Sequence, residues 1–199
     1  MCGAVLDTKG IHLVHCTHGN GGFLRHTSLV KCLRSLSKSA GFTVEEEDRS
    51  VFSPSSCRPD ITVFAYQQDG WDLLIDVSVV EPAAVSYLHR HSDTQPMAAA
   101  SCMAMVKRNK YSDLLLQART PFCPAVWESH GAVLDQVMDL VDHLCGMISE
   151  ESECFSPPNW AAQSPSRFWW QRLSIALQNA NVRKMRSLLA CAARNRIAA

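Results

Sequence analysis

The sequence predicts a mixed α/β domain in which helices cover a β-sheet. The chain has 199 residues and is 47% hydrophobic, which is enough apolar material for one core of ordinary size. Apolar patterns occur in the order helix, strand, strand, strand, helix, strand, helix, which is typical of a sheet covered by helices. No run of residues is long and apolar enough for a membrane span, and no secretory signal is recognisable, so we expect a nuclear or cytoplasmic protein that is not secreted.

The N-terminal half is predicted to contain one helix and then three strands. Residues 1–25 are rich in Gly, His and Cys, and we expect no long helix there. Thr27 or Ser28 can cap a helix that Gly41 ends, and apolar residues recur between them at helical spacing. We therefore predict a helix over 28–39. Short apolar runs between turn residues predict the three strands, at 41–52, 61–66 and 73–80.

The C-terminal half is predicted to contain a helix, a strand and two further helices. Residues 96–118 show helical spacing of Ala, Met and Leu, and the proline-bounded run 121–129 predicts a strand. Residues 132–148 form an amphipathic pattern with aspartates on one face. A polar, proline-rich linker precedes a basic amphipathic helix. We therefore divide the chain into a Cys/His-rich segment, a central domain, a linker and a C-terminal helix, at 1–25, 26–150, 151–166 and 167–199.

Two neighbouring predicted strands each carry an aspartate. Asp60 follows Pro59 at the start of one strand, and Asp76 lies inside the next, in LLIDVSVV. Because side chains alternate along a strand, Asp76 is expected to face away from the most apolar side. A short turn can bring both carboxylates to one place on the sheet, and such a pair is typical of a Mg²⁺ site. The alternative is that Asp60 caps a turn and Asp76 pairs with an arginine such as Arg58.

Further charged residues lie on the neighbouring predicted elements. Glu45, Glu46 and Glu47 lie on the preceding strand, and Lys107 and Lys110 lie on the following helix. Hydrolysis of a phosphodiester uses a metal ion to activate water and a cation such as lysine to stabilise the phosphate. The residue types therefore favour phosphodiester chemistry.

The order of these motifs resembles a known family. Pro59-Asp60, followed by Asp76 and then Ser78 two positions later, resembles the PD-(D/E)XK signature of restriction-endonuclease-like nucleases, with serine at the lysine position. The wider text is similar to the C-terminal region of non-LTR retrotransposon polyproteins over about residues 2–150. In that region a Cys/His zinc knuckle precedes a restriction-like endonuclease domain. The matching segments are GIHLVHCTHG, RHTSLVKCL, AGFTVEEE, RPDITVF, DLLIDVSVVEP, KRNKY and FCPAVWESHG.

The resemblance implies roles for individual residues. Asp60 and Asp76 would hold Mg²⁺ or Mn²⁺, and Glu47 would complete the acidic cluster. The lysine missing from the strand would come from the following helix, as Lys107 or Lys110 of a Lys-x-x-Lys-Tyr motif, and the spacing does not decide between them. We expect DNA contacts from basic and aromatic residues near the site and on the last helix, namely Arg58, Tyr111, Arg167 and Arg172.

The same resemblance implies a zinc site in the N-terminal segment. Cys2, His12 and Cys16 match the last three ligands of the knuckle, whose first cysteine would precede the first residue of this chain. His15 or His18 would then complete a tetrahedral Zn²⁺ site. In a chain with eight histidines and nine cysteines such a group also arises by chance. The odd number of cysteines argues against a disulfide framework.

The charges of the chain are unevenly distributed. All 19 acidic residues lie at or before Glu153, whereas the segment from Arg167 onward has seven positive residues and no negative one. Such a segment is typical of phosphate contact, and a solvated helix face is the alternative. The aromatic residues 168–170 can stack on bases or dock the helix onto the domain, and we favour docking.

The sequence supports two functional hypotheses. The first is a metal-dependent DNA endonuclease derived from a non-LTR retrotransposon, without the reverse transcriptase domain because no catalytic Asp-Asp polymerase motif is present. The second is a catalytically inactive remnant of such an element that binds nucleic acid, DNA or RNA, or acts as an interaction module. The first requires the carboxylates of Asp60 and Asp76 to lie within about 6 Å of each other. It also requires Lys107 or Lys110 in the same cleft, whereas the alternative leaves both lysines in solvent.

Overall fold

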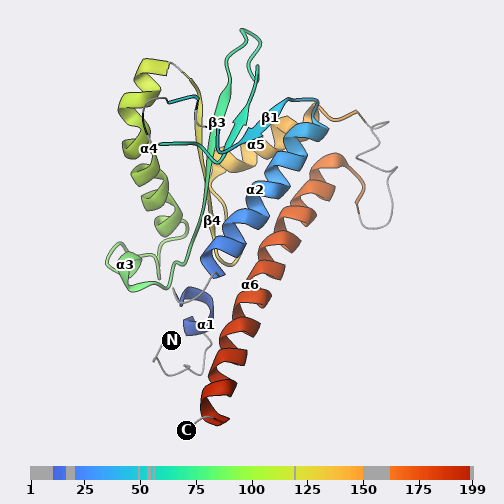
Figure 1. Cartoon of the computed structure of the whole chain (residues 1–199). Helices are drawn as coiled ribbons and strands as arrows, with labels where there is room; N and C mark the ends of the chain where they lie inside the picture. Colours follow the sequence, from blue (N-terminus) through green and yellow to red (C-terminus); the bar gives the residue numbers. More distant parts are fainter. Residues whose placement is uncertain are drawn as a thin grey trace.

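The protein is described by a computed structural model over residues 11–16, 21–48, 50–52, 55, 57–118, 120–149 and 162–197. Cys2, His18 and most of the predicted linker lie outside the described residues. The elements along the chain are α1 (Ile11–His15), α2 (Gly21–Ser39), β1 (Val44–Glu46), β2 (Ile61–Val63), β3 (Leu73–Val80), α3 (Val85–Leu88), α4 (Ala98–Ala118), β4 (Phe122–Glu128), α5 (Asp135–Gly146) and α6 (Pro165–Ile197) (Figure 1).

The four strands form one mixed sheet in the order β1-β2-β3-β4. Strand β2 is antiparallel to both β1 and β3, whereas β3 and β4 are parallel. A parallel pair requires a long crossover connection, and α4 lies in that connection. Between β2 and β3 the chain turns at Gly70, whose φ of 85° is readily adopted by glycine. The prediction of a mixed α/β fold with a sheet flanked by helices is confirmed.

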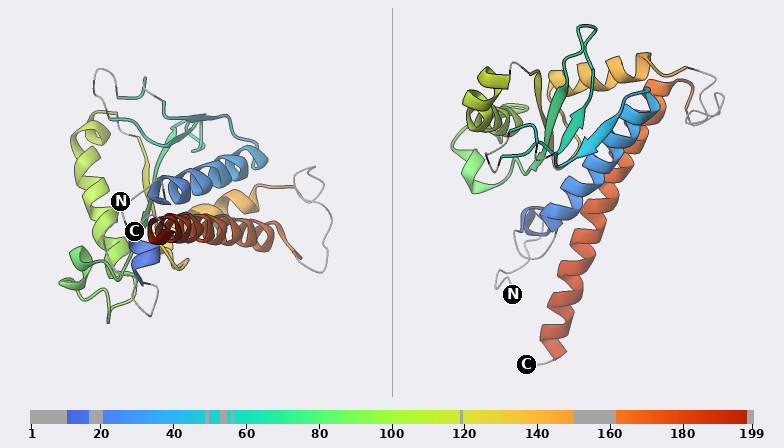
Figure 2. Two further views of the ribbon diagram at one scale, coloured as in Figure 1. Left: turned by 60° about the horizontal axis from the view of Figure 1, so that its bottom comes forward. Right: turned by 45° about the horizontal axis from the view of Figure 1, so that its top comes forward.

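Helices cover both faces of the sheet. Helix α4 lies on one face, and α2, α5 and α6 lie on the other (Figures 1 and 2). Leu73, Ile75 and Val77 of β3 belong to the main core beneath α2, α5 and α6. Leu74 packs instead with Tyr111 of α4. Because side chains alternate along the strand, Asp76 lies on the α4 side, as predicted from the sequence.

Helix α2 begins at Gly21, seven residues before the predicted start, so the expectation of no long helix before residue 26 is wrong for its last turn. The extra turns lack a clear apolar repeat in the sequence, and packing against α6 explains them. Lys184 of α6 is buried and donates a hydrogen bond to the carbonyl of Val14. A Cβ atom at Gly21 would overlap Cγ and Cδ of Lys184. Gly21 therefore permits the close approach of the two helices.

Replacing Gly21 with alanine is expected to lower the free energy of unfolding by about 1–3 kcal/mol, because the buried stem of Lys184 has to move. Gly22 provides the matched control, since no atom lies within 4 Å of a Cβ atom built there. Gly22→Ala should change the free energy of unfolding by less than about 1 kcal/mol. Urea unfolding followed by circular dichroism measures both effects, and equal values for the two variants would contradict the packing argument.

The first two strands are shorter than predicted. Strand β1 covers only three residues of the range 41–52, and Glu47 after it has a φ of 52°. Strand β2 ends at Val63 rather than at residue 66. Ala65 has a φ of 49°, and its N–H is donated to Oδ1 of Asp72 at 2.9 Å instead of to a neighbouring strand. Positive φ values take both residues out of strand geometry, which composition alone does not reveal.

Helix α6 packs into the same core as the sheet. It starts at Pro165, a favoured first residue of a helix, and it runs beside α2 (Figure 2). Trp169, Leu173 and Leu177 are fully buried in the main core, and Phe168 packs against it. The prediction that the aromatic residues dock this helix is therefore confirmed. No helix in the described part of the chain is long and apolar enough to cross a membrane.

Candidate functional site

The acidic residues predicted for the site lie in one row across three strands. The register pairs Glu46 with Ile61 and Ile61 with Ile75. The neighbouring row therefore contains Glu47, Asp60 and Asp76, and the N–H of Glu47 is donated to the carbonyl of Asp60 at 3.2 Å. Directly opposed residues of antiparallel strands place their side chains on the same face. The hairpin between β2 and β3 thus brings the two aspartates together.

The carboxyl groups of Asp60 and Asp76 converge on one place, because the register sets the two residues opposite each other and Oδ2 of Asp60 accepts a hydrogen bond from the N–H of Val77, the residue after Asp76. Burial, the hydrogen bond to Asp60 and its nearby charge raise the pKa of Asp76 to about 6. Burial also acts to raise the pKa of Asp60, but hydrogen bonds from His26, Asp76 and the N–H of Val77 outweigh it and lower that pKa. Val77 donates to Oδ2 of Asp60 at 2.6 Å. Like charges this close titrate as a pair, with the proton retained on Asp76.

Lys107 is the lysine that points into this site. Its Nζ lies 2.9 Å from both Oδ1 and Oδ2 of Asp76, and its side chain is 18% exposed. Lys110 is exposed, and its Nζ lies 3.3 Å from the hydroxyl of Tyr111. The alternative pairing of Asp76 with Arg58 is contradicted, because Arg58 pairs with Glu47 at 3.3 Å.

The face of α4 explains why Lys107 is selected. Ala100 and Ala104 are buried against the sheet side, and Tyr111 is buried further along the helix. These residues and Lys107 are spaced by four, three and four positions, so they share one face of the helix. Small alanine side chains allow α4 to approach the sheet closely, and the Lys107 stem then spans the remaining gap to Asp76.

His26 is a site residue that sequence reasoning missed. It lies on α2, and its Nε2 is 2.9 Å from Oδ2 of Asp60. The hydrogen bond to Asp60 raises the pKa of His26. The available signal was its spacing of four and seven positions from Val30 and Leu33, which are both buried. The predicted helix started at residue 28, and His26 was therefore excluded from that face.

Two other predicted site residues have different positions from those expected. Tyr111 is fully buried and donates its hydroxyl to the carbonyl of Arg58 at 2.7 Å, so the expectation that it contacts DNA does not fit the structure. Burial and the nearby Asp76 raise the pKa of Tyr111. Glu47 is in the expected row, but its side chain is 59% exposed and pairs with Arg58 instead of joining the two aspartates.

The remaining predicted DNA contacts lie on α6, on the sheet face opposite α4. Arg167 is exposed and donates to Oε1 of Gln163 at 2.6 Å. The guanidinium carbon of Arg172 lies 5.0 Å from the centre of the Trp169 ring. These arginines are therefore separate from the carboxylate pair, and any role in DNA binding would be exercised at another surface.

The donor set of the carboxylate pair suits a magnesium ion. Among the described residues no group of three or more His, Cys, Asp or Glu side chains is placed to hold a metal. Mg²⁺, however, keeps several water ligands and is usually held by only one or two carboxylates together with substrate phosphate. Asp60 and Asp76 are the residues that could supply such oxygens, and in the present arrangement Lys107 contacts both oxygens of Asp76 while His26 and the N–H of Val77 contact Oδ2 of Asp60. For zinc, His12 and Cys16 lie at α1, whereas Cys2 falls outside the described residues, so the predicted knuckle stays a prediction.

A second polar cluster, also missed from the sequence, lies at the carboxyl ends of β3 and β4. Ser129 donates to Oε2 of Glu81 at 2.6 Å, and Asn181 of α6 donates to the carbonyl of Ser129 at 2.8 Å. Burial lowers the pKa of the neighbouring Lys184 to about 8. Arg25 is buried beside them. The cluster joins α2 and α6 to the end of the sheet, which is a structural role.

Comparison with protein-family models and with curated proteins gives no match for this chain.

Proposed function

We propose that this protein is a metal-dependent DNA endonuclease with a restriction-endonuclease-like site, similar to those of non-LTR retrotransposons. The observation that carries the proposal is the pair formed by the buried Asp76 and the half-buried Asp60, with Lys107 bound to both oxygens of Asp76 at 2.9 Å. Burying two adjacent carboxylates is costly without a compensating cation or proton. Lys107 and His26 each contact one aspartate of the pair, and two adjacent carboxylates beside a lysine are the groups that a site for a divalent ion and a phosphate would use.

The arrangement of elements supports the same proposal. An initial helix, three antiparallel strands, a crossover helix and a strand parallel to the third one follow in the order that the apolar patterns of the sequence predict. Asp60 lies at the start of the second strand, Asp76 lies within the third, and Lys107 replaces the missing strand lysine from the crossover helix. Position and residue type therefore agree for three residues that are far apart in the sequence.

The residues of the site have distinct roles in this proposal. Asp60 and Asp76 would hold Mg²⁺ or Mn²⁺, which activates water and neutralises charge on the phosphate. Lys107 holds a positive charge beside Asp76 and stabilises the charge that develops on the phosphate oxygens during hydrolysis. His26 and the N–H of Val77 orient the carboxylate of Asp60.

Nicking of supercoiled plasmid tests the proposal. Asp76→Asn and Asp60→Asn keep the side-chain shape and remove the charge, and each should lower the Mg²⁺- or Mn²⁺-dependent rate by about 10²- to 10³-fold. Asp93→Asn is the matched control, because Asp93 is exposed in a loop. EDTA should abolish nicking by the wild-type protein. The proposal fails if the wild-type and Asp76→Asn proteins nick equally, or if the wild type cleaves none of supercoiled, linear and single-stranded DNA.

A catalytically inactive nucleic-acid-binding protein is the second candidate. The observation in its favour is that the side chain of Glu47 turns to Arg58, which leaves two rather than three acidic groups at the site. This candidate predicts DNA or RNA binding that persists in EDTA, and no cleavage with any divalent ion. The nicking experiment above distinguishes the two candidates directly.

A further inference from the structure

Helices α2 and α6 form the most basic part of the molecule. They run side by side, and together they carry 11 of the 19 Lys and Arg residues, four on α2 and seven on α6. Neither helix contains any of the 19 acidic residues. Two adjacent helices without a carboxylate produce a positive potential that does not depend on single contacts.

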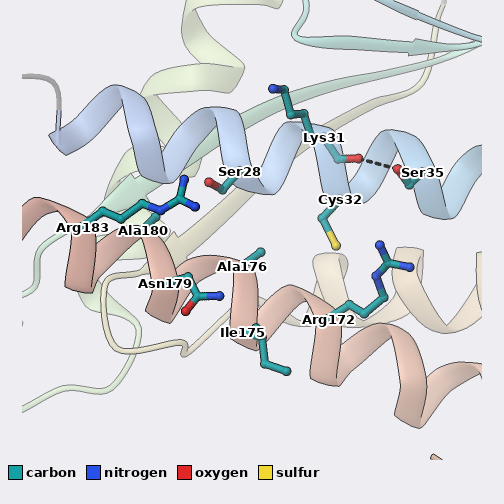
Figure 3. Close-up of a pocket in the computed structure, with 10 residues that line it drawn as sticks. All are labelled: Ser28, Lys31, Cys32, Ser35, Arg172, Ile175, Ala176, Asn179, Ala180 and Arg183. Atoms are coloured by element: carbon teal, nitrogen blue, oxygen red, sulfur yellow. Dashed lines mark hydrogen bonds between the residues drawn. The ribbon is translucent and has the colours of Figure 1, made fainter.

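A groove of about 390 Å³ lies between these helices, and polar and positively charged side chains line it together with small apolar ones and Ile175. In Figure 3, Arg172 and Arg183 both extend from α6 toward α2. Ser28 of α2 and Asn179 of α6 contribute a hydroxyl and an amide to the lining, and Lys31 belongs to its α2 side. The lining contains no carboxylate. Every charged group of this α2/α6 groove is therefore suited to an anionic ligand.

The cations of the groove are not used in ion pairs. In the part of the chain that the structure describes, Lys31 and Arg183 pair with no acidic side chain, whereas Arg34, Arg58 and Lys107 each do. Arg172 is positioned by its contact with the ring of Trp169. In Figure 3 the side chain of Lys31 extends to the side of α2 away from α6, so the cations that reach over the groove are Arg172 and Arg183. A solvated helix face usually mixes both signs of charge, and two such cations without an acidic neighbour in the groove indicate a binding surface.

The dimensions favour an extended polyanion. Arg172 and Arg183 are eleven residues apart on one helix, which corresponds to about 16 Å along its axis. Over that length one strand of a DNA duplex carries about five phosphates. Backbone phosphates are contacted by Arg, Lys, Ser and Asn side chains, which are the residue types found here.

We propose that the α2/α6 groove binds the phosphate backbone of double-stranded DNA at a place separate from the carboxylate site. This inference rests on the proposed function, since it takes the nuclease substrate as the ligand. The groove lining includes neither aspartate of the site nor Lys107. Helix α2 links the two places, because His26 contacts Asp60 while Ser28 and Lys31 line the groove. A duplex that contacts the groove would therefore also lie along the helix that carries His26.

Binding of a labelled DNA duplex in EDTA tests the groove without any cleavage. Fluorescence anisotropy at several salt concentrations gives the affinity and its salt dependence. Arg183→Gln should reduce the slope of log K against log salt by about one, and Arg172→Gln/Arg183→Gln by about two. Arg90→Gln is the matched control, since Arg90 is an exposed arginine far from the groove in sequence, in the loop after α3. It should leave both the affinity and the slope unchanged.

Four results would overturn the inference, and the fourth also separates it from the proposed function. The first is an equal loss of affinity in Arg183→Gln and Arg90→Gln, and the second is no retention of DNA by the wild type even at low salt. The third is groove-dependent binding to vesicles containing phosphatidylserine without binding to DNA, which would assign the groove to a membrane surface. If the wild type binds DNA through the groove residues but does not nick it, the nuclease proposal is refuted and the groove proposal is supported. As the fourth result, normal nicking and binding by Arg172→Gln/Arg183→Gln refute the groove and leave the nuclease in place.

Discussion

Replacing Lys107 with methionine should reduce metal-dependent nicking by about 10²- to 10³-fold, the range found when one group that stabilises a transition state is removed. Lys110→Met should retain most of the activity. The two lysines are three residues apart, yet the Nζ of Lys107 contacts both oxygens of Asp76 while Lys110 is exposed beside Tyr111. Each variant therefore removes one positive charge. Lys107→Met removes it from inside the site, and Lys110→Met removes it from outside the site.

The Lys107 variant needs a control for folding, because it leaves Asp76 buried without its cation. Its thermal unfolding should be compared with that of Lys107→Met/Asp76→Asn, in which both charges are removed and stability should be partly regained. DNA affinity in EDTA should stay unchanged in Lys107→Met, since the charge acts on the reacting phosphate rather than on binding. A larger loss of nicking in Lys110→Met than in Lys107→Met would show that the wrong lysine has been assigned.

Much of the sheet and of the acidic site follows from local sequence patterns. The apolar runs and the turn at Gly70 define a hairpin, and the hairpin register places Asp60 opposite Asp76. The choice between the lysines could also have been made from the sequence. Lys107 continues the spacing of the buried Ala100 and Ala104, whereas Lys110 does not.

Other features depend on contacts between distant parts of the chain and leave little local signal. The first turns of α2 are stabilised by α6, and His26 reaches Asp60 only because those turns are helical. Likewise, Glu47 occupies the expected row, but its positive φ and its pairing with Arg58 direct its side chain away. A repeat of apolar residues predicts which elements form, whereas their termini and side-chain directions are decided by tertiary packing.

The stability of the protein should respond to Mg²⁺ only where Asp76 is ionised. The pKa of Asp76 is raised from 3.8 to about 6 in the folded protein, chiefly by burial. A raised carboxyl pKa contributes stability that is fully present below the unfolded value and is lost as pH rises through the folded value. Without metal, the wild type should therefore lose stability relative to Asp76→Asn between about pH 4 and pH 6.

Added Mg²⁺ is expected to reverse this loss above about pH 6, because the ion and the proton compete for the same carboxyl pair. Thermal unfolding with and without Mg²⁺ should show a higher Tm for the wild type at about pH 7.5 and no change at about pH 5. Asp76→Asn should show no response at either pH, while Asp93→Asn should behave as the wild type. The rate of nicking should rise over the same pH range. A Tm increase of equal size at both pH values, or any increase in Asp76→Asn, would mean that Mg²⁺ binds elsewhere. The pairing of Asp60 and Asp76 would then need an explanation without a metal ion.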